Sequence, residues 1–199
     1  GIAIANNTFG NQAAILVGDY LYSMAFRLIS ELNHPTILDY LANITSQIVE
    51  GEIMQLAHSH SQISWENYLQ IITAKTGLLF AASCHCTALL HQDKEEDLLQ
   101  AGLDLGIGYQ IIDDCLDYTL NNEAWGKKPG DDLRDGKSTL PLILLAKHYP
   151  DWDLSTNLQN PSPEFISKAL NLVAQHDIIS ECRTVASRYI DRARSRFKE

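Results

Sequence analysis

The 199-residue sequence has little positive charge in its first two thirds and no regular cysteine spacing. Only Arg27, Lys75 and Lys94 precede residue 127, and the net charge is −10, so general binding to nucleic acid or to anionic lipid is not expected. The four cysteines form no CxxC pair, which is typical of a reducing compartment, and we predict a cytoplasmic location. Cys84 and Cys86 lack a second ligand pair at a usual spacing, which argues against structural zinc.

Long uncharged stretches are also missing. The two longest, 1–18 and 76–92, contain Asn, Gln, Ser, Thr or His and are too short and too polar to cross a membrane. No basic segment precedes an apolar run, as a signal peptide would require. We therefore predict neither a membrane span nor a signal peptide. With 45% hydrophobic and 20% charged residues, the chain can still bury a substantial core.

What the sequence does contain is apolar residues at helical spacing nearly throughout, with no strand alternation. Ser64 and Ser162 are typical residues before a helix, and Thr36 and Asp93 are further candidates for an N-cap. These features predict an all-α fold. The expected helices cover 11–32, 37–60, 64–90, 93–118, 163–176 and 179–198, with a short one ending near 149 and connections at 120–141 and 150–162.

Three carboxylates gather near the end of the helix predicted over 93–118. Asp113, Asp114 and Asp117 follow Gln110 on an otherwise apolar helix, where like charges repel and need a positive partner. Carboxylate oxygens without His or thiolate favour Mg²⁺, which completes its shell with water and substrate phosphates. We therefore interpret the cluster as a Mg²⁺ site for a phosphorylated substrate. The alternative is an exposed acidic helix face, which is common in acidic proteins.

Cations follow and precede this cluster along the chain. The glycine-rich loop 126–139 carries Lys127 and Lys137, and lysines act as point charges on phosphate, although such a loop taken alone is more often only solvated. Lys75, followed by Thr76, is either a snorkelling side chain or a phosphate ligand. Beside the aspartates, we interpret both segments as diphosphate-binding. A solvated helix face is the interpretation for the basic residues Arg183, Arg188, Arg192, Arg194, Arg196 and Lys198.

Together these motifs resemble those of the trans-polyprenyl diphosphate synthases, especially the long-chain bacterial branch, in order and spacing. The segments that carry the resemblance are Phe9-Gly10-Asn11, Leu16 to Tyr20, Glu50-Gly51-Glu52 with Gln55, Lys75-Thr76, Gln110 to Tyr118, and Gly126 to Pro141. The resemblance implies an isoprenoid synthase helical bundle around an apolar tunnel, usually a homodimer packed through helices like 11–32 and 37–58. It also implies a prenyltransferase that condenses isopentenyl diphosphate with an allylic prenyl diphosphate, giving an octaprenyl-type product for quinone side chains.

The resemblance assigns roles to individual residues. By matching position, Asp113, Asp114 and Asp117 correspond to the family's second aspartate-rich motif, which holds Mg²⁺ on the allylic diphosphate. The positions that bind this diphosphate correspond to Lys75, Thr76, Gln110, Lys127 and, as an expected helper, Lys137. The main catalytic roles are expected for Asp113, Asp114 and Lys75.

One part of the family pattern has no counterpart here. The first aspartate-rich motif and the basic residues for isopentenyl diphosphate lie upstream of the segment beginning at Phe9 in the family, and nothing in this sequence matches them. We therefore expect residues 1–199 to be the C-terminal portion of a single polyprenyl synthase domain. Two alternatives stay open. A class I terpene cyclase would not normally carry the Gly-Lys motifs at Gly126 and Gly136, and a catalytically silent subunit would not need the carboxylates and lysines.

Overall fold

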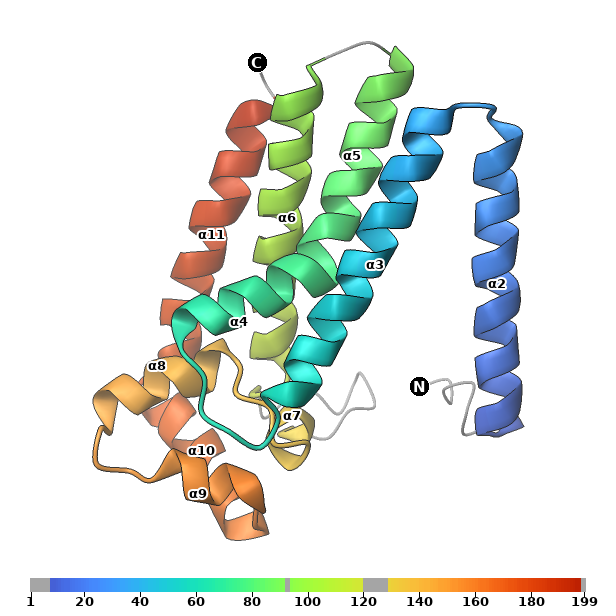
Figure 1. Cartoon of the computed structure of the whole chain (residues 1–199). Helices are drawn as coiled ribbons and strands as arrows, with labels where there is room; N and C mark the ends of the chain where they lie inside the picture. The colour runs from blue at the N-terminus through green and yellow to red at the C-terminus, as the bar shows by residue number, and fades with distance from the viewer. Residues whose placement is uncertain (1–7, 92–93, 120–128, 198–199) are drawn as a thin grey trace. The chain divides into compact units, whose positions relative to one another are not determined.

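The computed structural model describes residues 8–91, 94–119 and 129–197, and these ranges contain helices and turns but no strand. The all-α prediction is therefore confirmed (Figure 1). In chain order the elements are α2 (Asn11–Glu31), α3 (Pro35–Ala57), α4 (Trp65–Ile72), η1 (Thr73–Gly77), α5 (Leu78–His91), α6 (Glu95–Leu116), α7 (Asp131–Arg134), α8 (Leu140–His148), α9 (Leu154–Gln159), α10 (Pro163–Gln175) and α11 (Ile178–Arg196).

Residues 1–43 and 44–199 form two compact units, and α3 crosses the boundary between them. In the first unit no residue of α2 is buried, and the side chains of Leu16 and Tyr20 are 67% and 63% exposed. By length and composition alone α2 could cross a membrane, a test that the core helix of a soluble protein or a signal sequence also passes. No membrane span was predicted from the sequence because only uncharged stretches were considered. Helix α2 was not among them, since it contains Asp19. The absence of a membrane span therefore stays a prediction.

Helix α6 is central to the second unit and lies between α5 and α11 (Figure 1). Two glycines of α6 allow this close packing. A Cβ atom on Gly102 would lie 2.6 Å from the carbonyl oxygen of Phe80 in α5, and one on Gly108 would lie 2.8 Å from Ile190 in α11. Neither position has room for a side chain. The helix that carries the three aspartates therefore packs closely against a neighbouring helix on two sides.

The buried core of the second unit extends farther along the chain than the sequence predicts. Residues 150–162 are predicted as a surface connection, but α9 forms within them and is capped by Asp153, whose carboxylate accepts from the Thr156 N–H at 3.0 Å. Leu154 and Leu158, one helical turn apart, are fully buried in the core. The prediction was wrong here because two leucines in a short polar stretch do not form a recognisable period.

Two predicted helix starts are confirmed by their cap hydrogen bonds. The hydroxyl groups of Ser64 and Ser162 each accept from the backbone N–H three residues on, at 3.2 and 3.1 Å. The predicted cap at Thr36 is wrong, because α3 already begins at Pro35. The predicted cap at Asp93 lies outside the described residues.

A π-helical turn interrupts the helix predicted over 64–90. This turn, η1, joins α4 to α5 without a break in the chain's helical path. A π-turn holds one residue more than an α-helical turn and so rotates the residues that follow it relative to those before. Hydrophobic periodicity did not reveal it because the chain is apolar on both sides.

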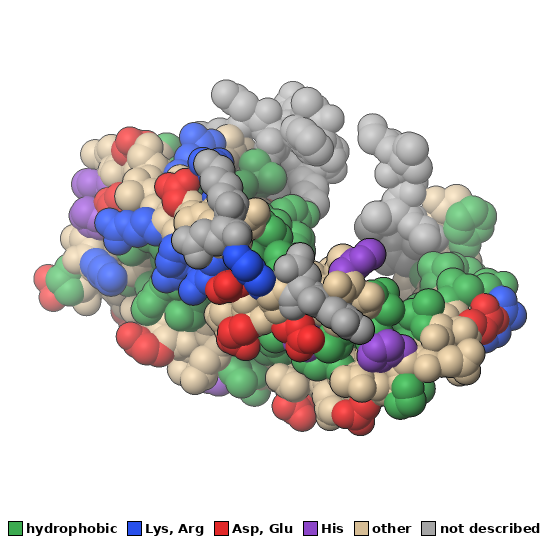
Figure 2. Space-filling view, turned by 90° about the horizontal axis from the view of Figure 1, so that it is seen from above, with side chains coloured by type: hydrophobic (Ala, Val, Ile, Leu, Met, Phe, Trp, Pro, Cys, Tyr) green, Lys and Arg blue, Asp and Glu red, His purple; other side chains and the backbone are tan. Residues whose placement is uncertain are grey.

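Two arginines of α11 also pair with a buried carboxylate, a role that the sequence does not predict. Asp104 of α6 is buried, and its two carboxylate oxygens accept from Arg192 at 2.6 Å and from Arg196 at 2.8 Å. The guanidinium group of Arg192 also lies 4.3 Å from the ring centre of Tyr189. In the view of Figure 2, which looks at the molecule from above, most of the visible Lys and Arg side chains lie on the left. The side chains of Arg192 and Arg196 are still 55% and 35% exposed, so the solvated interpretation is incomplete and not wrong: both also neutralise a buried charge.

Candidate active site

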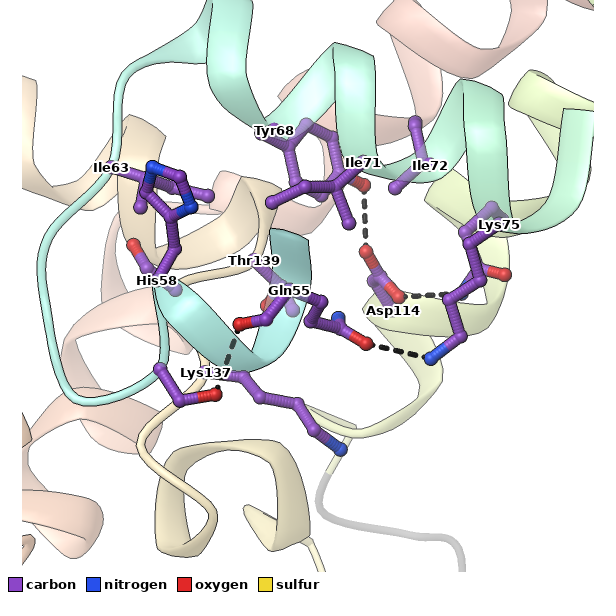
Figure 3. A pocket seen from close by; sticks show the side chains of 13 residues that line it. Gln55, His58, Ile63, Tyr68, Ile71, Ile72, Lys75, Asp114, Lys137 and Thr139 are labelled. Carbon is purple, nitrogen blue, oxygen red and sulfur yellow. Dashed lines mark hydrogen bonds between the residues drawn. The ribbon is translucent and has the colours of Figure 1, made fainter. Parts of the chain in front are cut away.

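The three predicted metal-binding aspartates lie at the C-terminal end of α6, in different environments. Asp113 is exposed, Asp117 is half-buried and Asp114 is buried. The Tyr68 hydroxyl donates to Oδ2 of Asp114 at 2.6 Å (Figure 3), and the Gln110 amide donates to Oδ1 at 2.8 Å. Both oxygens of Asp114 are therefore already held by protein donors.

Burial and neighbouring negative charge make two of these carboxyl groups weaker acids. Burial raises the pKa of Asp114 to about 7; its two hydrogen bonds oppose the rise, and the charges of Asp132 and Asp113 add to it. Burial, together with the charge of Asp132, also raises the pKa of Asp117 to about 6. A carboxyl group whose pKa is raised in this way lacks a compensating positive charge, so the cluster favours a bound cation.

Asp117 holds the chain segment that leads into α7. Its side-chain oxygens accept from the backbone N–H groups of Asp131 at 3.1 Å and Asp132 at 3.0 Å, and its carbonyl oxygen accepts from the Gly130 N–H at 2.8 Å. Gly130 has a φ of +84°, a left-handed conformation that suits glycine. The end of α6 and the start of α7 are thus joined through one aspartate.

The π-turn η1 brings Lys75 and Thr76 to this region. Lys75 Nζ lies 2.7 Å from Oε1 of Gln55 (Figure 3). It also lies 3.0 Å from Oε2 of Glu52, and both partners are on α3. The Thr76 hydroxyl donates to the amide oxygen of Gln110 at 2.7 Å. Two residues predicted to bind diphosphate are therefore fixed by partners on two different helices.

The loop around Gly136 brings Lys137 to the same region. Lys137 Nζ lies 3.1 Å from a carboxylate oxygen of Asp132 and 3.0 Å from one of Asp135. Gly136 is left-handed, with φ +67°, and its carbonyl oxygen accepts from the His60 N–H at 2.8 Å. The His60 ring donates through Nδ1 to a carbonyl oxygen of α9 at 3.0 Å. His60 therefore fastens the lysine loop to α9.

A small cavity of about 30 Å³ lies where these segments meet (Figure 3). It has room for a water molecule or two. Four predicted residues line it: Lys75, Gln110, Asp114 and Lys137. The Ser138 hydroxyl, also in the wall, is buried and has no hydrogen-bond partner in the described ranges. An unpaired buried hydroxyl costs on the order of 1–3 kcal/mol, so this wall suits a polar ligand or an ordered water.

The other predicted residues stand outside the cavity wall. Thr76 reaches it only through Gln110, Asp113 and Asp117 do not line it, and Lys127 lies outside the described residues. Among the residues the structure describes, no three His, Cys, Asp or Glu side chains gather closely enough to hold a metal ion on their own. This arrangement fits Mg²⁺, which usually takes one or two carboxylates and completes its shell with water and substrate.

Three residues of the site were not found from the sequence. Tyr68 and His60 lie in the second unit at positions whose spacing suggests core packing, and the contacts that give them a role come from residues distant in sequence. Ser138 lies within the glycine-rich loop, beside Lys137, but a serine in a polar loop carries no signal of burial. Their partners, rather than their own spacing, define their roles.

Comparison with known proteins agrees with this geometry. The model of the polyprenyl synthetase family matches residues 1–173. Octaprenyl diphosphate synthase from Escherichia coli (strain K12) is 40% identical over 152 residues, which are 74% of this chain and 47% of that protein. The enzyme of the same name from Haemophilus influenzae is 35% identical over 205 residues, covering 100% of this chain and 60% of that protein. The chain thus spans about half the length of the curated relatives it matches.

Solved structures give the same result. A crystal structure of polyprenyl synthase from Caulobacter crescentus, complexed with calcium and isoprenyl diphosphate, has a TM-score of 0.90 and 35% identity, covering 100% of this chain and 63% of that one. Octaprenyl pyrophosphate synthase from Helicobacter pylori has a TM-score of 0.82 and 30% identity, covering 97% and 64%. The resemblance seen in the sequence motifs is confirmed, and the chain belongs to the polyprenyl synthetase family.

Proposed function

We propose that this chain is part of a Mg²⁺-dependent trans-prenyltransferase that condenses isopentenyl diphosphate with an allylic prenyl diphosphate. Its main support is the meeting of Lys75, Gln110, Asp114 and Lys137 around one cavity, although they come from three segments far apart in the sequence. Charges that were only solvated would have no reason to line the same cavity as a buried carboxylate. Since the relatives are longer, the activity is proposed for a whole protein that contains this chain.

The acidic end of α6 fits Mg²⁺ better than a softer metal, because the carboxylate oxygens of Asp113, Asp114 and Asp117 are hard ligands. Asp113 is exposed, and each oxygen of the other two keeps a second lone pair beside its protein donor. Bound Mg²⁺ would neutralise the charge that builds on the departing pyrophosphate. The calcium in the Caulobacter crescentus relative, which also contains isoprenyl diphosphate, supports a divalent cation.

The chain's own residues are proposed to bind the allylic diphosphate and to keep water away. Lys75, Lys127 and Lys137 act as point charges on its oxygens, which favours breakage of the allylic C–O bond. The double bond of isopentenyl diphosphate attacks the allylic carbon, and the proton then lost passes to the released pyrophosphate. Apolar side chains of α4, among them Ile71, line the cavity and exclude water from the allylic cation.

Product and assembly complete the proposal. An octaprenyl-type product for quinone side chains is proposed because the relatives from Escherichia coli and Haemophilus influenzae are octaprenyl diphosphate synthases. A homodimer packed through α2 and α3 is supported by the exposed apolar side chains of α2. A cytoplasmic location is proposed from the four free cysteines.

An assay of the full-length protein tests this function. With allylic diphosphate, isopentenyl diphosphate and Mg²⁺, we expect a linear polyprenyl diphosphate on chromatography. Asp113→Ala and Lys75→Ala should each lower turnover by about 100-fold or more, with unchanged helicity by circular dichroism. Lys168→Ala is the control, because Lys168 lies over Trp152, away from the cavity.

Three results would contradict the proposal. Turnover like that of the wild type in both Asp113→Ala and Lys75→Ala would remove the proposed roles of these residues. A cyclic hydrocarbon formed without isopentenyl diphosphate would identify a terpene cyclase. No product from the full-length protein purified alone would favour a silent subunit.

A further inference from the structure

Helices α4 and α5 continue one another through the π-turn η1, and this turn changes which side chains face α6. In an uninterrupted α-helix each residue turns by about 100°, so Tyr68 and Thr76, eight positions apart, would point about 80° away from each other. The extra residue in a π-turn removes one such step and leaves them about 20° apart. Both side chains can then reach the same neighbouring helix.

Tyr68 and Thr76 contact two residues that lie one turn apart on α6. The Tyr68 hydroxyl donates to Asp114 at 2.6 Å, and the Thr76 hydroxyl donates to the amide oxygen of Gln110 at 2.7 Å. The amide nitrogen of Gln110 donates to the second oxygen of Asp114 at 2.8 Å. These bonds form an unbroken chain from α4 through α6 to η1. The Asp114 carboxylate cannot rotate without breaking one of them.

The hydroxyl group of Tyr68 contributes more than its ring does to this arrangement. The ring is 2% exposed and packs against Trp65, with 5.8 Å between ring centres. A phenylalanine would fill the same volume and keep that packing. It would leave one oxygen of a buried carboxylate without a donor, beside the negative charges of Asp113 and Asp132. What the hydroxyl adds is control over where the Asp114 carboxylate points.

We propose that Tyr68 is a positioning residue of the active site, which together with the Thr76–Gln110 pair orients Asp114 toward the cation and the diphosphate. This inference rests on the proposed function. It adds a residue outside the aspartate-rich segment and the lysine segments, held in register with them by the π-turn. A purely structural hydrogen bond between Tyr68 and Asp114 would affect folding and leave ligand binding unchanged.

Calorimetric titration of the full-length protein with inorganic pyrophosphate in the presence of Mg²⁺ separates these two roles. We expect Tyr68→Phe to bind pyrophosphate about tenfold more weakly than the wild type, the loss expected for one hydrogen bond to a charged group. It should also lower kcat and leave KM for isopentenyl diphosphate unchanged. Tyr149→Phe is the matched control, because the Tyr149 hydroxyl bonds the ring of His176, away from the cavity.

Wild-type pyrophosphate affinity in Tyr68→Phe would overturn the inference. If Asp113→Ala abolishes turnover in the same protein, the proposed function survives that failure. If both Asp113→Ala and Lys75→Ala keep full turnover, the proposed function fails and this inference fails with it. Thr76→Val removes the hydroxyl group at the other end of the hydrogen-bond chain. The double variant should therefore lose less pyrophosphate-binding free energy than the sum of the losses in Thr76→Val and Tyr68→Phe. Additive losses would mean that the two hydroxyl groups act separately, contrary to the proposal.

Discussion

At the scale of single residues, Asp114 occupies the position in this site where negative charge is hardest to accommodate. It is buried, it lies near Asp113 and Asp132, and its donors are the neutral groups of Tyr68 and Gln110. With a pKa of about 7, the carboxyl group is protonated below neutral pH and only about half ionised at pH 7 when no cation is bound. A divalent cation would replace that proton, so metal binding and protonation compete for this group.

This competition predicts how stability depends on pH without metal. From about pH 4 to about pH 7 the carboxyl group of Asp114 ionises in the unfolded chain while it stays protonated in the folded one, so its contribution to stability falls as pH rises. The fall is on the order of a few kcal/mol. In EDTA, Asp114→Asn should flatten the pH profile of the urea-unfolding free energy over this window. Asp151→Asn, at an exposed aspartate, should not. An unchanged slope in Asp114→Asn would contradict the assignment.

The sequence predicted the charged residues of the site better than the neutral residues that hydrogen-bond to them. Lys75, Gln110, Asp114 and Lys137 were found because like charges on an apolar helix and rare cations are visible in one dimension. Tyr68 was not found, because it lies 46 positions from Asp114 and only folding brings its hydroxyl to that carboxylate. Neutral residues that support a charge leave no local pattern.

At the scale of elements, α6 and α11 are joined by a buried charge as well as by apolar packing. The side chain of Asp104 is 9% exposed and is paired with two arginines one turn apart on α11. Loss of one arginine leaves the other in place. Loss of both leaves an uncompensated charge between the two helices.

The double variant Arg192→Ala/Arg196→Ala should therefore lower the free energy of unfolding by about 3 kcal/mol in urea titrations followed by circular dichroism. Arg192→Ala alone should have a smaller effect. Arg194→Ala is the control, because Arg194 pairs with the exposed Asp191, and it should change stability by about 0.5 kcal/mol or less. Equal effects of the double variant and the control would show that Asp104 does not depend on these arginines.

The contact between α3 and η1 depends on a single glycine. A Cβ atom on Gly51 would lie 2.6 Å from the Cβ atom of Ala74 and 3.0 Å from the backbone nitrogen of Lys75. Because a backbone atom cannot move aside cheaply, Gly51→Ala should destabilise the full-length protein by about 1–3 kcal/mol in thermal or urea unfolding, and it should weaken pyrophosphate binding by displacing Lys75. A neutral Gly51→Ala would contradict the close approach.

Elements with a chemical signal at their ends were predicted well, and those set by packing were not. Ser64 and Ser162 mark helix starts because their hydroxyl groups satisfy backbone N–H groups locally. The π-turn and α9 depend on contacts with distant parts of the chain, such as those of Thr76 and Leu158. Hydrophobic periodicity distinguishes neither of them from a continuous helix or a surface loop, although Asp153 gives α9 a local cap that was not recognised from the sequence.

At the scale of the whole molecule, α2 carries apolar side chains that are exposed in this chain. The exposed large apolar side chains of this helix are Ile15, Leu16, Val17, Tyr20, Leu21, Tyr22 and Leu28. Surfaces of this kind mark sites of interaction with another chain or another segment. The proposed homodimer supplies such a partner.

Charged residues introduced on this helix should therefore change the oligomeric state of the full-length protein, which sedimentation experiments measure as the mass of the sedimenting species. We expect a dimer for the wild type and a monomer for Leu16→Asp/Tyr20→Asp, because both side chains lie on one face of α2 and a buried charge opposes association. Phe197→Asp, at the end of α11 and also about half exposed, should stay dimeric. A monomeric wild type, or a variant that keeps its dimeric mass, would contradict the proposed interface.

The extra residue in η1 also limits how this stretch of chain can change in length. Substitutions between Tyr68 and Thr76 alter one side chain at a time. Deleting one residue within η1 would turn it into an ordinary α-helical turn and leave the two hydroxyl-bearing residues seven positions apart, still about 20° from each other and facing α6, whereas inserting a residue would carry the Thr76 hydroxyl away from α6. Homologous sequences that retain both hydroxyl contacts should therefore align from Tyr68 to Thr76 either without a gap or with one residue missing, and without insertions, even where the connections after α3 and α6 differ in length.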